Sequence, residues 1–281
     1  MKLFRKFKKL FGIYRQLTKI ENVLVHQSIE LIKNNERYKD SKNLIPFGNK
    51  IYSQNEEDGI IQEIFKRIGT TNKVFVEFGI GNGLENNTYA LLFDGWTGLW
   101  IEGSKSATEN ISKALNKTIN SGKLIVKNAF IYKSNINELI STSIKHDEID
   151  LLSIDIDGND IHIFNEIECV NARVVVIEYN PKFAPPIKYC KKYKDDHIWN
   201  RDDNFGASLK FLELEFEKSG YSLVGCNITG SNAFFVRSDL TDDKFQKPYT
   251  AELHYEPSRR HLTSYSSGHK SSFKTLEESI N

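Results

Sequence analysis

One acidic residue and three spaced glycines stand at the end of a short apolar run, and their types and spacing suggest a ligand site. The sequence VFVEFGIGNG covers residues 74–83 and places Glu77 before Gly79, Gly81 and Gly83. A short apolar run predicts a buried parallel strand. Glycines after such a strand let the backbone turn tightly and come close to a ligand. An acid at this turn suits a ligand with an amino group or a positive charge and does not suit a phosphate.

Acidic or amide residues also end the later apolar runs. They are Glu102 after residues 98–102, Asn128 and Ala129 after 124–126, Asp155 and Asp157 after 150–155, and Glu178 and Asn180 after 173–178. In an open α/β sheet the ligand lies outside the carboxyl ends of the strands, so these side chains are expected around one site. An acid at the end of the second strand takes ribose hydroxyls in nucleotide-binding folds, which is the predicted role of Glu102.

Asp155, Glu178 and Asn180 form a predicted metal site at two neighbouring strand ends. Carboxylate and amide oxygens suit Mg²⁺ or Ca²⁺ and do not suit zinc. Such a cation would hold two substrate oxygens and lower the pKa of a hydroxyl group. The alternative is an acidic pocket that binds a polyol through hydrogen bonds alone. In both cases Asp157 is a predicted substrate contact.

The long segment after Pro181 carries the candidate catalytic base. His197 lies within the sequence KYKDDHIWNRDDNFG, and loops of this length usually have a function. A histidine accepts a hydroxyl proton near neutral pH, so His197 is the predicted base, with Asp155 as the second catalytic candidate. Tyr193 and Trp199 either stack on a sugar ring or pack within the protein. The alternative for His197 is a surface position without a role.

The segment before the glycine turn has two interpretations. Residues 52–59 read YSQNEEDG and lead into a predicted helix over residues 60–68. Ser53 and Glu56 have the spacing of a capping box. The position of the segment also lets Ser53 and Gln54 reach the ligand at the glycine turn.

Strand-like and helix-like runs alternate through the middle of the chain, which predicts a parallel sheet with right-handed crossovers. Helices are expected over residues 104–121, 136–144, 161–167 and 207–219. The last two strands, 221–226 and 232–237, are too close for a helix between them and form an antiparallel hairpin. The fold class is therefore α/β, with a mostly parallel sheet of seven strands.

Five parallel strands, a helix and a closing hairpin resemble the sheet of class I S-adenosylmethionine (SAM) methyltransferases. The spacing E-x-G-x-G-x-G resembles the first motif of that family. A nicotinamide-dependent sugar oxidoreductase is the rival enzyme, and its Rossmann sheet would stay parallel at that edge. The set of Asp155, Glu178 and Asn180 resembles metal-dependent O-methyltransferases. Here Tyr179 separates Glu178 from Asn180, whereas the family pair is usually adjacent.

Residues 52–237 further resemble FkbM-like methyltransferases found with bacterial surface-polysaccharide genes. The strings YSQNEEDG, VFVEFGIGNGLENNT, GLWIEGS, LLSIDIDGND, VVVIEYNP, GASL and NAFFVR carry this resemblance. It implies SAM as donor and a sugar or sugar-linked hydroxyl of a capsule or lipopolysaccharide precursor as acceptor. The implied cofactor contacts are Ser53, Gln54, Glu77, Gly79, Gly81, Asn87, Glu102, Asn128, Ala129 and Asp155. A non-catalytic scaffold in polysaccharide assembly is the rival that is not an enzyme.

The composition restricts the class of protein. The 281 residues are 39% hydrophobic and carry a net charge of +1, so no global field attracts nucleic acid. The three cysteines are scattered and show neither metal spacing nor a disulfide framework. A cytoplasmic location is expected from this cysteine usage. No apolar run is long enough to span a membrane.

Two extensions flank the predicted methyltransferase domain of residues 46–238. Residues 1–45 begin with a basic amphipathic helix, which has leucine at positions 3, 10, 17, 24 and 31 and no acid before Glu21. Such a helix lies on the inner face of a membrane, pairs two copies of the chain, or packs on its own domain. Residues 239–281 are polar and are expected to form a tail that covers the site or stays free.

Overall fold

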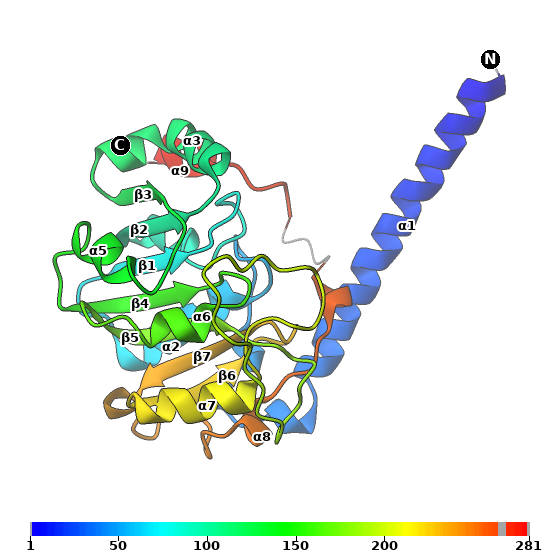
Figure 1. Ribbon diagram of the computed structural model, residues 1–281. Coiled ribbons are helices and arrows are strands. Elements are labelled where there is room, and N and C mark those ends of the chain that lie inside the picture. The colour runs from blue at the N-terminus through cyan, green and yellow to red at the C-terminus, as the bar shows by residue number, and fades with distance from the viewer. Residues whose placement is uncertain (1, 264–267, 280–281) are drawn as a thin grey trace.

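The computed structural model describes residues 2–263 and 268–279. Within this part of the chain, seven strands form one sheet in the order β3-β2-β1-β4-β5-β7-β6 (Figure 1). Strands β1 to β5 are parallel, and β7 runs antiparallel to both β5 and β6. The predicted sheet of the class I methyltransferase type, closed by an antiparallel hairpin, is therefore confirmed.

The strands lie close to their predicted positions. They are β1 (Val74–Phe78), β2 (Thr97–Glu102), β3 (Leu124–Asn128), β4 (Glu148–Ile154), β5 (Asn171–Glu178), β6 (Tyr221–Cys226) and β7 (Asn232–Arg237). The α-helices are α1 (Lys2–Lys33), α2 (Glu57–Ile68), α3 (Lys105–Ala114), α4 (Asn116–Asn120), α5 (Ile136–Ser141), α6 (Asp160–Phe164), α7 (Leu209–Lys218), α8 (Ala251–His254) and α9 (Lys274–Ser279). Short 3₁₀ helices are η1 (Glu36–Tyr38), η2 (Ile45–Phe47), η3 (Ala90–Asp94), η4 (Ser238–Leu240) and η5 (Arg260–Leu262).

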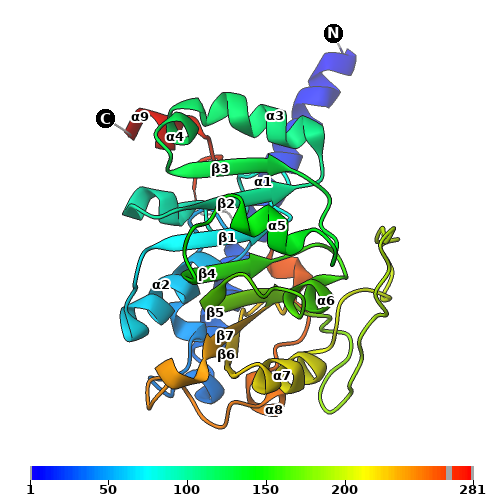
Figure 2. The ribbon, with the colours of Figure 1, turned by 60° about the vertical axis from the view of Figure 1, so that its left-hand side comes forward.

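Helices cover both faces of the sheet and bury a core on each side (Figure 2). Helices α5, α6 and α7 pack on one face, where Val76 and Val175 point. Helices α2 and α3 pack on the other face, where Phe75 and Val174 point. Successive strand residues point to opposite faces, so a strand that is covered on both sides is apolar throughout. This explains why every residue of β1 is buried.

Two local predictions were wrong. The helix expected over residues 104–121 is interrupted at Leu115, and α4 starts there because the carboxylate of Glu277 accepts hydrogen bonds from the amides of Lys117 and Thr118. A contact from the far end of the chain thus creates a second helix start. The capping box of Ser53 is also not formed. The Ser53 hydroxyl donates to Asp58 at 2.9 Å, and Glu56 makes no side-chain cap.

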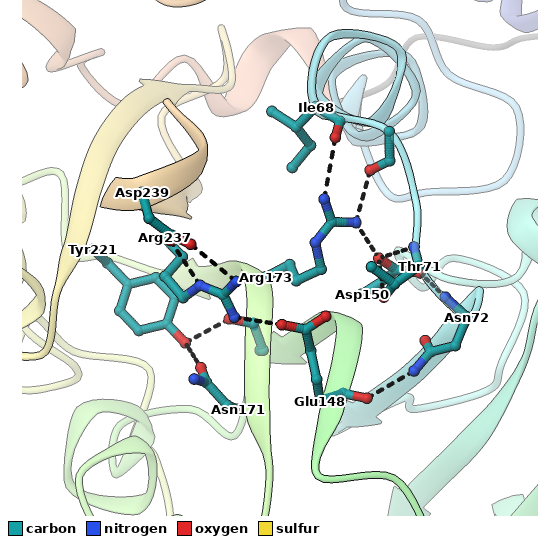
Figure 3. Close-up of polar contacts among 12 residues, drawn as sticks. Ile68, Thr71, Asn72, Glu148, Asp150, Asn171, Arg173, Tyr221, Arg237 and Asp239 are labelled. Atoms are coloured by element: carbon teal, nitrogen blue, oxygen red, sulfur yellow. Dashed lines mark hydrogen bonds and ion pairs between the residues drawn. The ribbon is translucent and has the colours of Figure 1, made fainter. Parts of the chain in front are cut away.

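A buried ion pair braces the end of the sheet opposite to the predicted site. Arg173 on β5 donates to Asp150 on β4 at 2.6 Å, and Asp150 also accepts from the amides of residues 71–73 (Figure 3). Burial raises the pKa of Asp150, but Arg173 and these amides hold it below its ordinary value. This network joins β4, β5 and the loop before β1, and the other ends of these three strands carry predicted site residues.

The two extensions pack against each other. The hydroxyl of Tyr38 donates to both oxygens of buried Glu256, and Arg259 donates to Glu256 at 2.7 Å. Arg37 donates to the carbonyls of residues 253 and 255. This part of the predicted tail also binds the body of the protein, because Tyr179 donates to the Glu256 carbonyl and Glu213 accepts from the Ala251 amide. In contrast, residues 10–20 of α1 are all exposed.

Candidate functional site

Two adjoining cavities open at the carboxyl ends of the parallel strands. Their volumes are about 500 and 290 Å³, and both are lined by Gly79, Gly81 and Asp155. The larger one is also lined by Ile101, Glu102, Gly103, Ala129, Phe130, Ile131, Tyr132, Ile156, Asp157, Asn159, Asp195, His197, Ile198 and Trp199. The smaller one adds Gln54, Glu77, Ile80, Asn82, Glu85, Asn86, Asn87 and Asn232. A further hollow of about 740 Å³ lies around Asn171 and Tyr221, and none of the predicted site residues lines it.

The glycine turn brings the end of β1 into contact with the end of β4. Gly79 has φ +71°, and a Cβ at this position would lie 1.6 Å from the carbonyl oxygen of Asp155. Gly81 has φ +54°, and a Cβ there would meet no atom within 4 Å. Only glycine allows this close approach and these positive φ angles at low cost. The open space beside Gly81 is room for a ligand close to the backbone.

The carboxylate of Glu102 accepts hydrogen bonds from backbone amides that a phosphate group would otherwise bind. Its Oε2 accepts from the Gly81 amide at 2.8 Å, and its Oε1 accepts from the Ser104 amide at 2.7 Å. The carboxylate thus ties the end of β2 to the glycine turn while it lines the larger cavity. A ligand at this position meets an acceptor for hydroxyl groups.

Glu77 is buried and holds the next loop in place. It accepts from the amides of Asn87 and Thr88, from the Asn86 side chain and from the hydroxyls of Thr88 and Ser153. Burial raises the pKa of Glu77 to about 7, although these hydrogen bonds act in the opposite direction. Glu77 therefore shapes the smaller cavity through loop 86–88, in addition to lining it.

Three carboxylates converge between the glycine turn and β5. Oxygens of Asp155, Asp157 and Glu178 all lie within 4.8 Å of one another. Asp157 reaches this position with a φ of +59°, a strained value for a residue with a side chain. Asp160 stabilises the turn, because its carboxylate accepts from the amides of Ile156 and Gly158 at 2.8 Å.

No ion pair within 4.0 Å between described residues involves these three carboxylates, although His197 lowers the pKa of Asp157 and Arg260 lowers that of Glu178 through their charges. Burial, followed by the charges of neighbouring acids, raises the pKa of Asp155 and of Glu178 well above the ordinary values. One oxygen of Glu178 is buried without a hydrogen-bond partner. The raised pKa values favour a shared proton among these carboxyl groups, and a bound cation would relieve their repulsion in the same way.

Four predicted residues have other contacts. Asn180 donates to the carbonyls of Asp203 and Phe205 and is 1% exposed, so its amide holds the loop after β5. Ser53 is bound to Asp58, and the exposed Asn128 donates to carbonyls 102 and 103. Tyr193 donates to Asp195 at 2.5 Å. Ser53, Asn128, Asn180 and Tyr193 line neither cavity.

His197 and Trp199 line the larger cavity, and both lie on the long loop between β5 and α7. The Nε2 of His197 lies 2.9 Å from the carbonyl oxygen of Asp157, which can only accept, so Nε2 carries the proton and Nδ1 is the basic nitrogen. Trp199 donates from Nε1 to the carbonyl of Asp202. The histidine ring is thus held beside Asp157, and its role as a base stays a prediction.

The sequence interpretation missed several residues that line the cavities. Phe130 and Tyr132 lie within three residues after Ala129 and line the larger cavity. Their position just after the third strand could have predicted this. Asn86 and Asn232 each have a buried side-chain oxygen without a hydrogen-bond partner, and both line the smaller cavity. Asn232 faces Glu178 across the pair of β5 and β7, which is a contact between distant segments that no local pattern reveals.

No protein-family model matches the sequence, and a comparison with curated proteins found no match. Among solved structures, the methyltransferase domain of bacterial CtHen1-C is 16% identical, covers 65% of this chain and 97% of its own, and has a TM-score of 0.42. A SAM-dependent methyltransferase from Aquifex aeolicus is 10% identical, with coverages of 74% and 95% and a TM-score of 0.38. The N-terminal domain of EvdMO1, solved with SAH bound, is 9% identical, with coverages of 71% and 84% and a TM-score of 0.41.

Proposed function

We propose that this protein is a SAM-dependent O-methyltransferase whose acceptor is a sugar or a sugar-linked group of a capsule or lipopolysaccharide precursor. One observation carries the proposal. Two adjoining cavities, the glycine turn, Glu102 and the three carboxylates all lie at the same carboxyl edge of the sheet. This edge is where open α/β sheets bind ligands.

The donor set of the cavities fits SAM. Glu102 is the acceptor for ribose hydroxyls, and Ala129 with Phe130 and Tyr132 offers an apolar border for adenine. The unpartnered oxygens of Asn86 and Asn232 in the smaller cavity suit the ammonium group of the methionine end. Among the residues that line the two cavities there is no lysine or arginine, which suits a cationic sulfonium ligand.

The same features disfavour the nicotinamide-dependent rival. A dinucleotide needs the amides of the glycine turn for its pyrophosphate. Here the carboxylate of Glu102 accepts from the Gly81 amide at 2.8 Å and would repel a phosphate. The antiparallel hairpin of β6 and β7 at the sheet edge also differs from a dehydrogenase sheet.

The acid cluster fits a divalent cation such as Mg²⁺. Asp155, Asp157 and Glu178 offer hard oxygen ligands, and the unpartnered oxygen of Glu178 is an open coordination position. When bound, the cation would lower the pKa of an acceptor hydroxyl. His197 would accept the proton at Nδ1, while its Nε2 stays bound to the Asp157 carbonyl. The residues that line the two cavities would hold the acceptor oxygen in line with the methyl group.

Calorimetry with the full chain tests the proposal. SAM and its demethylated product should bind, while NAD⁺ and NADP⁺ should not. Binding of a nicotinamide cofactor without binding of SAM would overturn the donor assignment. If neither class of cofactor binds, the scaffold interpretation replaces the enzyme.

A further inference from the structure

Helix α1 leaves the body of the protein with one apolar side uncovered. Only its last part packs, where Val25, Ile29 and Ile32 contact the small core around Leu262. Figure 1 shows the N-terminal half of α1 standing clear of the sheet and its helices. A long helix with an uncovered apolar side needs a partner, because large apolar areas are costly to leave in water.

Large apolar side chains of this helix are exposed. Leu10, Phe11, Tyr14, Leu17 and Leu24 are between 57% and 69% exposed. A helix turns by about 100° per residue, so Leu10, Tyr14 and Leu17 lie on one side. The same rotation puts the residues at positions 15, 16 and 19 on the opposite side, and these are Arg15, Gln16 and Lys19. Between Leu10 and Lys19 the helix therefore has an apolar side and a polar, basic side.

The charge of this segment is of one sign. Residues 2–20 contain Lys2, Arg5, Lys6, Lys8, Lys9, Arg15 and Lys19 and no acidic residue. This pattern is complementary to a surface that combines negative charge with accessible hydrocarbon. An anionic membrane has both properties, and basic amphipathic helices with Phe and Leu on the apolar side bind in its interface.

A second copy of the chain fits the same segment less well. The heptad leucines would align two helices, but a parallel pair would bring two groups of seven like charges together. Paired helices of this kind need complementary charges beside the leucine seam, and like charges there destabilise the pair. An antiparallel pair of the whole helix is blocked, because the part around Val25 and Ile29 is packed on the body.

We propose that residues 2–20 of α1 bind an anionic membrane surface, with the helix lying in the interface. Lysines and arginines contact lipid headgroups, while Leu10, Tyr14 and Leu17 enter the hydrocarbon boundary. The helix does not cross the bilayer, since none of the described helices has the length and hydrophobicity for a span. The binding site is separate from the cavities at the strand ends and does not depend on the proposed enzymatic activity.

Sedimentation of the full chain with lipid vesicles tests this inference. Vesicles of phosphatidylcholine mixed with phosphatidylglycerol should bind the protein, and binding should weaken as salt is added. Pure phosphatidylcholine vesicles should bind it at least tenfold less. Absence of binding to the anionic vesicles, or equal binding to both kinds, would overturn the proposal.

A pair of variants separates the apolar contact from the charge. Leu17→Asp and Gln16→Asp add the same negative charge at neighbouring exposed positions, but only the first lies on the apolar side. Leu17→Asp should weaken vesicle binding at least tenfold more than Gln16→Asp, with unchanged thermal unfolding in both. Equal losses would contradict the proposed orientation. If the protein binds no vesicles but forms a dimer that Leu17→Asp dissociates, the apolar side contacts a second copy of the chain instead.

Discussion

Carboxylate oxygens of Asp155 and Glu178 lie within 4.8 Å of each other at the ends of two adjacent parallel strands. The register explains this proximity, because Ile154 pairs with Ile177 and the next residue of each strand is the acid. Two half-buried carboxylates at this separation repel each other unless a proton or a cation is shared. The relationship therefore links strand register directly to the proposed chemistry.

Asp155→Asn should abolish methyl transfer and leave SAM affinity within about threefold of the original, because the lost interaction acts on the acceptor and the transition state. EDTA should have the same effect, and Mg²⁺ should reverse EDTA but not the mutation. Activity assays measure methyl transfer, and calorimetry measures SAM affinity. The control is Asp196→Asn, an exposed acid that lines neither cavity. Full activity in EDTA would remove the metal and leave His197 or Asp155 as the direct base.

Glu102→Ala should weaken SAM binding at least tenfold, since the loss of a charged acceptor costs about 1.5–3 kcal/mol. The change removes the ribose contact and also frees the amides of Gly81 and Ser104. Calorimetry gives the affinity, and thermal unfolding shows whether the turn still folds. Glu109→Ala on α3 is the matched control, because this acid has only a weak contact with Lys105 at 4.0 Å. Unchanged affinity in a folded Glu102→Ala protein would place Glu102 outside the site.

Removal of residues 2–20 should leave the fold and SAM binding intact. Residues 10–20 are exposed, and the packing of α1 on the body begins with Val25. Thermal unfolding and calorimetry of the shortened chain check this. A second deletion that extends through residue 38 is the contrast, because it removes the contact of Tyr38 with Glu256 and should lower stability. Unfolding of the shorter deletion would show that the exposed part supports the body.

Arg173→Met should lower the free energy of unfolding by about 3–5 kcal/mol, because it leaves the buried Asp150 without its ionic partner. Arg237→Met is the control from the same region (Figure 3), and its pairs with Glu148 and Asp239 are partly exposed. The control should cost about 1 kcal/mol or less. Denaturant unfolding measures both variants. Equal losses would mean that Asp150 is stabilised mainly by the amides of residues 71–73.

Stability should fall as the pH rises from about 5 toward 9. Burial, with the charge of Glu57, raises the pKa of Glu56 to about 8. A carboxyl group whose pKa is higher in the folded than in the unfolded protein stabilises the folded state while it is protonated. This stabilisation is complete below the unfolded pKa near 4.5 and is lost as the pH rises through the folded pKa of about 8. Glu56→Gln should flatten the profile of unfolding free energy against pH, with exposed Glu36→Gln as control. Part of the slope should persist through Glu77, whose pKa is about 7. An unchanged slope would assign the pH dependence to other groups.

Local patterns in the sequence determined the strands, the closing hairpin and the acids at the strand ends. An apolar run that stops at an acid marks the carboxyl end of a buried strand, and parallel strands bring these ends to one edge. For this reason Glu102, Asp155 and Glu178 could be assigned to one site before any contact was known. Their separate chemical roles stay predictions.

Contacts between distant segments decided the rest. The carbonyls of Asp203 and Phe205 accept from the side-chain amide of Asn180, and the strained turn at Asp157 is held by the carboxylate of Asp160. Residue spacing cannot encode these outcomes, since they depend on which buried polar groups find partners after the chain has folded. The tertiary structure also showed that α1 leaves its apolar side exposed, because the body covers only the last part of the helix.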